Sequence, residues 1–81
     1  MTCYVYIVEC SDGTYYTGWT VNIDKRLYRH NHNDCGAKYT RVRRPVKLVY
    51  KEEFSDKILA MKREYEIKQL TRKQKEKLIL G

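Results

Sequence analysis

Four polar side chains in the first part of the chain have types and spacing suited to chemistry on a phosphodiester. Tyr6 and Tyr16 stand ten positions apart, Arg26 follows Tyr16 by another ten, and His30 comes four later. A phenol can take or give a proton, a guanidinium can hold a phosphate, and an imidazole can assist either. A nuclease needs such groups together, so the elements that position them become the question.

Residues 3–9 and 14–20 are rich in β-branched and aromatic side chains, and Ser11-Asp12-Gly13 between them is turn chemistry. This pattern predicts a β-hairpin. Its register decides whether the two phenols can meet. A two-residue Asp12-Gly13 turn would place Tyr6 and Tyr16 on opposite faces of the sheet.

A three-residue loop brings the two tyrosines onto one face. With Gly13 left-handed in a bulge, Tyr6 pairs with Gly18 and Val8 pairs with Tyr16. We expect this register. We also expect Gly18 to leave open space beside Tyr6, which a site admitting a phosphate backbone requires.

A first helix is expected from about residue 23 to 31, after capping residues between Thr20 and Asn22. Ile23 and Leu27 mark its inward face. Arg26 and His30 lie within about 60° of Ile23 on a helical wheel and therefore point toward the sheet. An inward arginine is costly unless it is paired, so it is rarely idle.

The segment 31–45 reads as a loop whose second half is basic. Cations interleaved with an aromatic suit a nucleic-acid backbone and an unstacked base, although solubility alone would also explain an exposed charge run. The predicted nucleic-acid-binding residues here are Lys38, Tyr39, Arg41, Arg43 and Arg44.

The rest of the chain predicts one strand and two helices. The strand spans 46–52 after Pro45, and a helix capped by Ser55 or Asp56 runs to about residue 70. Thr71 with Gln74 resembles a capping box that opens a short final helix. The expected fold is therefore α+β, a three-stranded antiparallel sheet flanked by helices in the order β-β-α-β-α-α, in one domain covering residues 1–81.

Glu64, like Arg26, is a charged residue that we expect on the inward face of a helix. On a wheel centred on Ala60 we expect Glu64 in the apolar arc with Met61 and Ile67, and an outward arc made of Lys62, Arg63, Glu66 and Gln69. A carboxylate in the apolar arc must pair with a cation, bind a metal or carry a raised pKa. A structural ion pair to Arg26 or Lys68 is the simpler explanation, and a metal site is the alternative.

The amino-acid composition indicates what kind of partner the protein binds. Lys and Arg number 17 against 10 Asp and Glu, giving a net charge of +7 and a pI near 9.4, and eight tyrosines add stacking surfaces. A polyanion is the favoured partner. No apolar stretch is long enough to cross a membrane and no signal-peptide pattern opens the chain, so we expect a cytoplasmic protein without membrane contact.

The cysteines indicate neither disulfides nor structural zinc. Cys3 and Cys10 are seven positions apart, which on a strand points them to opposite faces. Cys35 follows His30 and His32, but no second ligand pair stands elsewhere at finger-like spacing. We expect free thiols.

Tyr4-Val5-Tyr6, followed ten residues later by Tyr16-Thr17-Gly18, resembles a variant of the GIY-YIG signature of small metal-dependent endonuclease domains. Arg26 falls where that family places its arginine, and Glu64 where it places a helical glutamate. The resemblance covers nearly the whole chain and is closest to the small stand-alone, YhbQ-like members.

The resemblance implies hydrolysis of DNA phosphodiester bonds, on non-standard structures in repair or nucleic-acid processing, with DNA favoured over RNA. Tyr16 would activate water with Tyr6 as its partner, Arg26 would bind the phosphate, and His30 would orient or relay a proton. Glu64 would hold Mg²⁺ or Mn²⁺. Two alternatives stay open: a nucleic-acid-binding module with little or no catalysis, and an interaction protein whose tyrosines are core.

Overall fold

The computed structural model describes residues 2–32 and 43–81. In this part of the chain the elements follow the order β1 (Cys3–Glu9), β2 (Tyr15–Thr20), α1 (Ile23–His32), β3 (Lys47–Phe54), α3 (Lys57–Lys68) and α4 (Arg72–Leu80). The strands form one antiparallel sheet in the order β2-β1-β3, with β1 at its centre. The predicted α+β fold is therefore confirmed.

The hairpin register is the one that the three-residue loop predicts. Tyr6 pairs with Gly18 and Val8 pairs with Tyr16. Gly13 has a φ of 84°, and its amide donates to the Cys10 carbonyl to close the turn. Tyr6 and Tyr16 therefore lie on the same face of the sheet.

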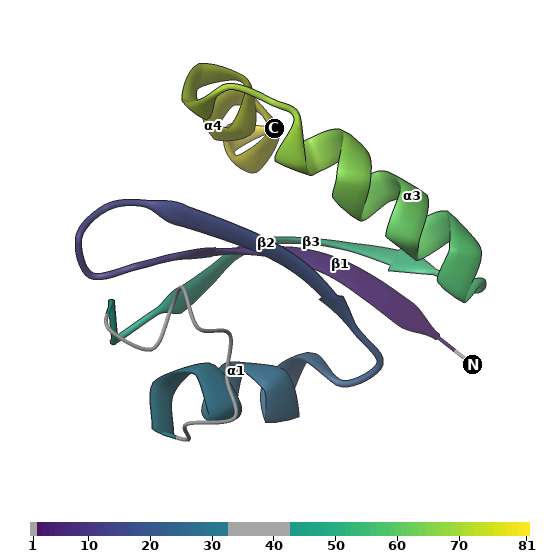
Figure 1. Ribbon diagram of the computed structural model, residues 1–81, viewed down its shortest axis with the longest axis horizontal. Helices are drawn as coiled ribbons and strands as arrows, with labels where there is room; N and C mark the ends of the chain where they lie inside the picture. The colour runs from purple at the N-terminus through teal and green to yellow at the C-terminus, as the bar shows by residue number, and fades with distance from the viewer. Residues whose placement is uncertain (1, 33–42) are drawn as a thin grey trace.

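Helices cover both faces of this sheet (Figure 1), with α3 and α4 on one side and α1 on the other. On the α3 side, the buried side chains of β1 meet those of α3 in a core of Cys3, Val5, Ile7, Ala60 and Ile67. On the α1 side, a second core contains Tyr6, Val8, Cys10 and Val46. Cys3 and Cys10 are buried free thiols, one in each core, as the strand alternation predicts.

Local hydrogen bonds fix α1 against the rest of the fold. The Asn22 side chain accepts from the Lys25 amide at 3.0 Å, which caps the start of the helix. At the other end, the Asn31 side chain accepts from the Val46 amide and donates to the Val46 carbonyl, at 2.7 and 3.1 Å. These hydrogen bonds hold the helix that carries Arg26 and His30 to the beginning of β3.

The third strand runs two residues further than predicted and contains a bulge. Ile7 pairs with Tyr50 and Val8 with Leu48, so Val49 is an extra residue in β3. Val49 and Tyr50 consequently both pack against the core on the α3 side, while Leu48 joins the core on the α1 side.

The caps of the last two helices follow the sequence. Asp56 caps α3 by accepting from the Ile58 amide, and Thr71 and Gln74 form the predicted capping box of α4. The predicted orientation of α3 is wrong in two places. Met61 is 45% exposed although we expected it inward, and Arg63, expected outward, is half-buried. At about 100° per residue, Met61 lies about 100° from Ala60 whereas Arg63 lies only about 60° away on the other side.

Candidate active site

Tyr6 and His30 form the buried base of the site. Tyr6 is 2% exposed and His30 is 0% exposed. The Tyr6 hydroxyl and His30 Nε2 are 3.0 Å apart, and the His30 ring also lies edge-on to Tyr16, with centroids 5.5 Å apart. The inward face of α1 and the sheet thus bring together the two tyrosines and the histidine, as the wheel and the register predict.

Burial fixes the protonation of this pair. Desolvation raises the pKa of Tyr6 to about 12, against the opposing effect of the Arg26 charge. Desolvation, followed by the charges of Arg26 and Arg44, lowers the pKa of His30 below its usual 6.5. At neutral pH, Tyr6 is therefore a phenol and His30 is an uncharged imidazole.

The Tyr6 hydroxyl and His30 Nε2 form a buried hydrogen bond, whose donor depends on the tautomer of His30. The Arg26 guanidinium lies close enough to Tyr6 for its positive charge to oppose the effect of desolvation on the Tyr6 pKa. Arg26, Tyr6 and His30 therefore form one connected polar group that extends from the half-buried face of α1 into the core.

The expectation that Gly18 leaves open space beside Tyr6 is wrong. A Cβ added to Gly18 would lie 2.6 Å from the Tyr6 hydroxyl oxygen, because the Tyr6 ring itself lies over this glycine. Glycine is needed here so that Tyr6 can lie flat across the strand and reach His30. The room for a ligand lies instead at the outer edge of β2.

At this edge an open cleft of about 300 Å³ is lined from both faces of the sheet. Tyr16 and Gly18 border it on the α1 side, together with Arg26, and Glu64 reaches it from α3 on the other side. The full set of lining residues is Tyr16, Gly18, Trp19, Thr20, Val21, Arg26 and Glu64. The cleft therefore combines a phenol, a guanidinium and a carboxylate.

Glu64 is half-buried, with its side chain 20% exposed, and its carboxylate lies 3.4 Å from Lys68 Nζ one turn along α3. The ion pair to Lys68 is therefore present, as the simpler explanation expects. Lys68 is 47% exposed, and a pair this open to water contributes little to stability. Its presence therefore does not prevent the carboxylate from serving another ligand.

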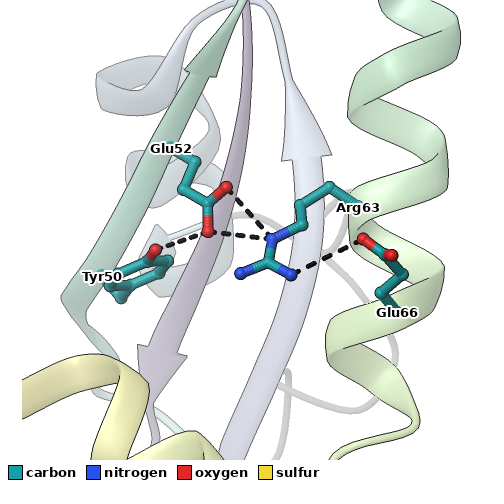
Figure 2. A network of polar contacts seen from close by, with 4 residues as sticks. All are labelled: Tyr50, Glu52, Arg63 and Glu66. Carbon is teal, nitrogen blue, oxygen red and sulfur yellow. Dashed lines mark hydrogen bonds and ion pairs between the residues drawn. The ribbon is translucent and has the colours of Figure 1, made fainter. Parts of the chain in front are cut away.

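A polar network between α3 and β3, which the sequence did not predict, fixes the rotation of α3 (Figure 2). Arg63 Nε donates to both carboxylate oxygens of Glu52 at 3.0 and 3.1 Å, and Tyr50 donates to the same carboxylate. Arg63 also lies 3.5 Å from Glu66. Arg63 immediately precedes Glu64, so the helix that carries Glu64 to the cleft is also joined to β3 by this network.

The donor set at the cleft suits a weakly held divalent cation. Among residues 2–32 and 43–81, no group of three or more His, Cys, Asp or Glu side chains could enclose a metal. Mg²⁺ keeps several waters and is often bound through one or two carboxylates, so Glu64 beside a water-accessible cleft fits this coordination.

Of the predicted loop at residues 31–45, the structure describes residues 31–32 and 43–45. Arg43 pairs with Asp12 at 3.1 Å, and Arg44 Nε donates to the His30 carbonyl at 2.7 Å. These arginines therefore tie the chain to the hairpin turn and to the end of α1. Lys38, Tyr39 and Arg41 lie outside the described residues, as does Cys35. Within the described residues, no helix is both long and apolar enough to cross a membrane.

Known proteins resemble this chain over most of its length. A family model described as the GIY-YIG catalytic domain matches residues 2–77. A UPF0213 protein of Clostridium perfringens is 62% identical over 76 residues, which cover 94% of this chain and 81% of that protein. A UPF0213 protein of Halobacterium salinarum is 59% identical over 75 residues, covering 93% and 96%.

Two solved structures share the fold. The solution NMR structure of a UPF0213 protein from Bacillus halodurans is 49% identical, with a TM-score of 0.63 over 98% of this chain and 83% of that one. That of a protein from E. faecalis is 44% identical, with a TM-score of 0.65 over 95% and 81%. The match of the family model over nearly the full length, on a fold that brings Tyr16, Arg26 and Glu64 to one cleft, shows that this chain belongs to the GIY-YIG family of endonuclease domains.

Proposed function

We propose that this protein is a metal-dependent endonuclease that hydrolyses DNA phosphodiester bonds in the cleft at the β2 edge. One observation carries the proposal: Tyr16, Arg26 and Glu64, from three different elements, line the same cleft of about 300 Å³. The net charge of +7 supports a polyanionic substrate. Non-standard DNA structures in repair or nucleic-acid processing are the proposed substrates.

Tyr16 is the proposed group that takes the proton from the attacking water. It borders the cleft, and its ring contacts His30. Tyr6 has a different role, because its raised pKa of about 12 keeps it protonated and its hydroxyl is committed to His30. Tyr6 and His30 therefore hold Arg26 and Tyr16 in place from below.

Arg26 is the proposed phosphate ligand, since it lines the cleft and its positive charge acts on the neighbouring Tyr6. A guanidinium bound to a phosphate offers two parallel donors. Glu64 would hold Mg²⁺ or Mn²⁺, which when bound would stabilise the charge that develops on the phosphate and the leaving oxygen.

The proposal is tested by incubating the pure protein with single-stranded, duplex, flap and branched DNA, with Mg²⁺, with Mn²⁺ and with chelator. We expect cleavage of at least one form that chelator abolishes. Glu64→Gln should abolish this cleavage, whereas Glu66→Gln, on the exposed face of the same helix, should retain it. Cleavage that persists in chelator, or in Glu64→Gln, would contradict the proposal.

A binding module without catalysis is the second candidate. It is favoured by the deep burial of Tyr6 and His30 and by the ion pair that already occupies Glu64. The same experiment separates the two functions, because a binding module would retain affinity for the DNA without cutting it in either metal.

A further inference from the structure

Two cations are held over aromatic rings near the two ends of β2. Lys57 Nζ lies 5.7 Å from the centre of the Trp19 ring, and the Arg72 guanidinium carbon lies 4.8 Å from that of Tyr15. Lys57 begins α3 and Arg72 begins α4, so the two cations come from successive helices. Both rings project from the α3 side of the sheet.

The two pairs stand at opposite ends of the same edge strand. Trp19 and Tyr15 are four residues apart in β2, which corresponds to about 13 Å of strand. Measured along the axis of duplex DNA, where one strand advances by about 3.4 Å per phosphate, that separation corresponds to about four phosphates. The cleft with Tyr16, Arg26 and Glu64 opens along the same strand: its lining begins beside Tyr15, at Tyr16, and includes Trp19.

The edge between them is available to a ligand. In the described residues, β2 is the outer strand of the sheet and pairs only with β1. In Figure 1, α3 and α4 lie on the same side of the sheet, with α4 toward the hairpin turn. Lys57 is exposed, and the Arg72 side chain is 55% exposed.

The aromatic rings hold the cations ready for a ligand. A cation over a ring face gains electrostatic attraction, and a long side chain already held in place loses less conformational entropy when it binds. Arg72 also pairs with Glu76 at 3.0 Å, but both side chains are exposed, and such a pair competes weakly with a phosphate.

We propose that one strand of the nucleic acid runs along the free edge of β2, past the cleft, and that Lys57 and Arg72 bind its phosphates near the two ends of this edge. This inference rests on the proposed function, because it identifies the path of the substrate through that site. It also moves the main binding surface away from the segment of Arg43 and Arg44, which are engaged with the hairpin turn and α1.

The test is the salt dependence of binding to a fluorescent single strand of 20 mixed nucleotides, in chelator so that nothing is cut. The test variant carries Lys57→Gln and Arg72→Gln. The control variant carries Lys62→Gln and Lys73→Gln, which remove the same charge from exposed positions of α3 and α4. On a single strand, each phosphate that the protein no longer neutralises should reduce the slope of log Kd against log salt by about 0.7.

We expect the slope of the test variant to fall by about twice that amount and the control variant to keep the parent slope. Equal slopes for both variants, or no binding by the parent at low salt, would overturn the inference. Cleavage in Mn²⁺ is measured on the same proteins. If the parent protein does not cut DNA while the slopes of the two variants differ, the proposed function is overturned and the binding path stands. If the parent cuts DNA while the two slopes are equal, the binding path is overturned and the proposed function stands.

Discussion

His30 is a fully buried imidazole whose uncharged form the fold favours, and this has a consequence for stability. Its pKa is lowered in the folded state, chiefly by desolvation. The unfolded chain therefore binds more protons than the folded one between the folded pKa and about 6.5. We predict that the free energy of unfolding falls as pH drops through this window, by at most about 1.4 kcal/mol per pH unit from this group.

Urea unfolding at several values between pH 5 and 8 measures this effect. The variant His30→Gln should lose part of the slope, whereas His32→Gln, which changes an exposed imidazole on the same helix, should keep it. A parent protein that gains stability on acidification through this range would contradict the buried, uncharged state of His30.

Gly18 is the residue over which Tyr6 lies, so its side chain cannot grow without moving the phenol. We predict that Gly18→Ala destabilises the protein by about 1–3 kcal/mol through overpacking and disturbs the hydrogen bond between Tyr6 and His30. Gly13→Ala is the matched control, since its Cβ would meet nothing but its φ of 84° would be strained.

Both glycine variants should lose stability in urea, but only Gly18→Ala should shift the NMR signals of the His30 ring. An unchanged imidazole spectrum in Gly18→Ala would show that Tyr6 keeps its hydrogen bond to His30, and would contradict the need for glycine at this position.

Among the elements, α3 has its rotation fixed by Arg63, whose side chain reaches over the sheet to Glu52 on β3. Glu52 accepts from Arg63 and Tyr50 in a half-buried network. We predict that Glu52→Gln lowers the free energy of unfolding by about 1–3 kcal/mol, because it weakens charge-assisted bonds in a partly desolvated place. It should also reduce cleavage, since Glu64 depends on the position of α3.

Glu66→Gln removes the other carboxylate beside Arg63. Because Glu66 is 64% exposed, this control should change stability by less than about 1 kcal/mol and leave cleavage intact. Urea unfolding and the DNA cleavage assay measure both variants. Equal reductions of stability in the two would show that Glu52 does not anchor α3.

Much of this element structure could be predicted because its signals are local. Ser11-Asp12-Gly13 determines the hairpin register, and Thr71 with Gln74 determines the start of α4. The bulge at Val49 could not be predicted, since the apolar run around it has no alternation to mark a change of face. The pairing of Arg63 with Glu52 depends on how a helix packs on a sheet, which local periodicity does not encode.

At the scale of the whole molecule, the candidate site is assembled at one edge of a thin sheet. Tyr16 and Arg26 approach this edge from the α1 side and Glu64 from the α3 side. The sequence could identify these residues individually, because each is a polar group in an apolar pattern or part of a recognisable signature. It could not show that the ligand space lies outside β2, because that depends on the Tyr6 ring filling the space over Gly18.

The most direct measurement of the cleft's function follows Mn²⁺ by NMR, together with the melting temperature, in the parent and in Glu64→Gln. We predict that Mn²⁺ broadens the amide signals of Gly18, Arg26 and Glu64 in the parent, that Glu64→Gln abolishes this broadening, and that the melting temperature changes little. Lys68, the partner of Glu64, is 47% exposed, so neutralising the carboxylate of this pair costs little stability. A sharp drop in melting temperature in Glu64→Gln, with no response of the parent to Mn²⁺, would instead make Glu64 a structural residue and contradict the metal site.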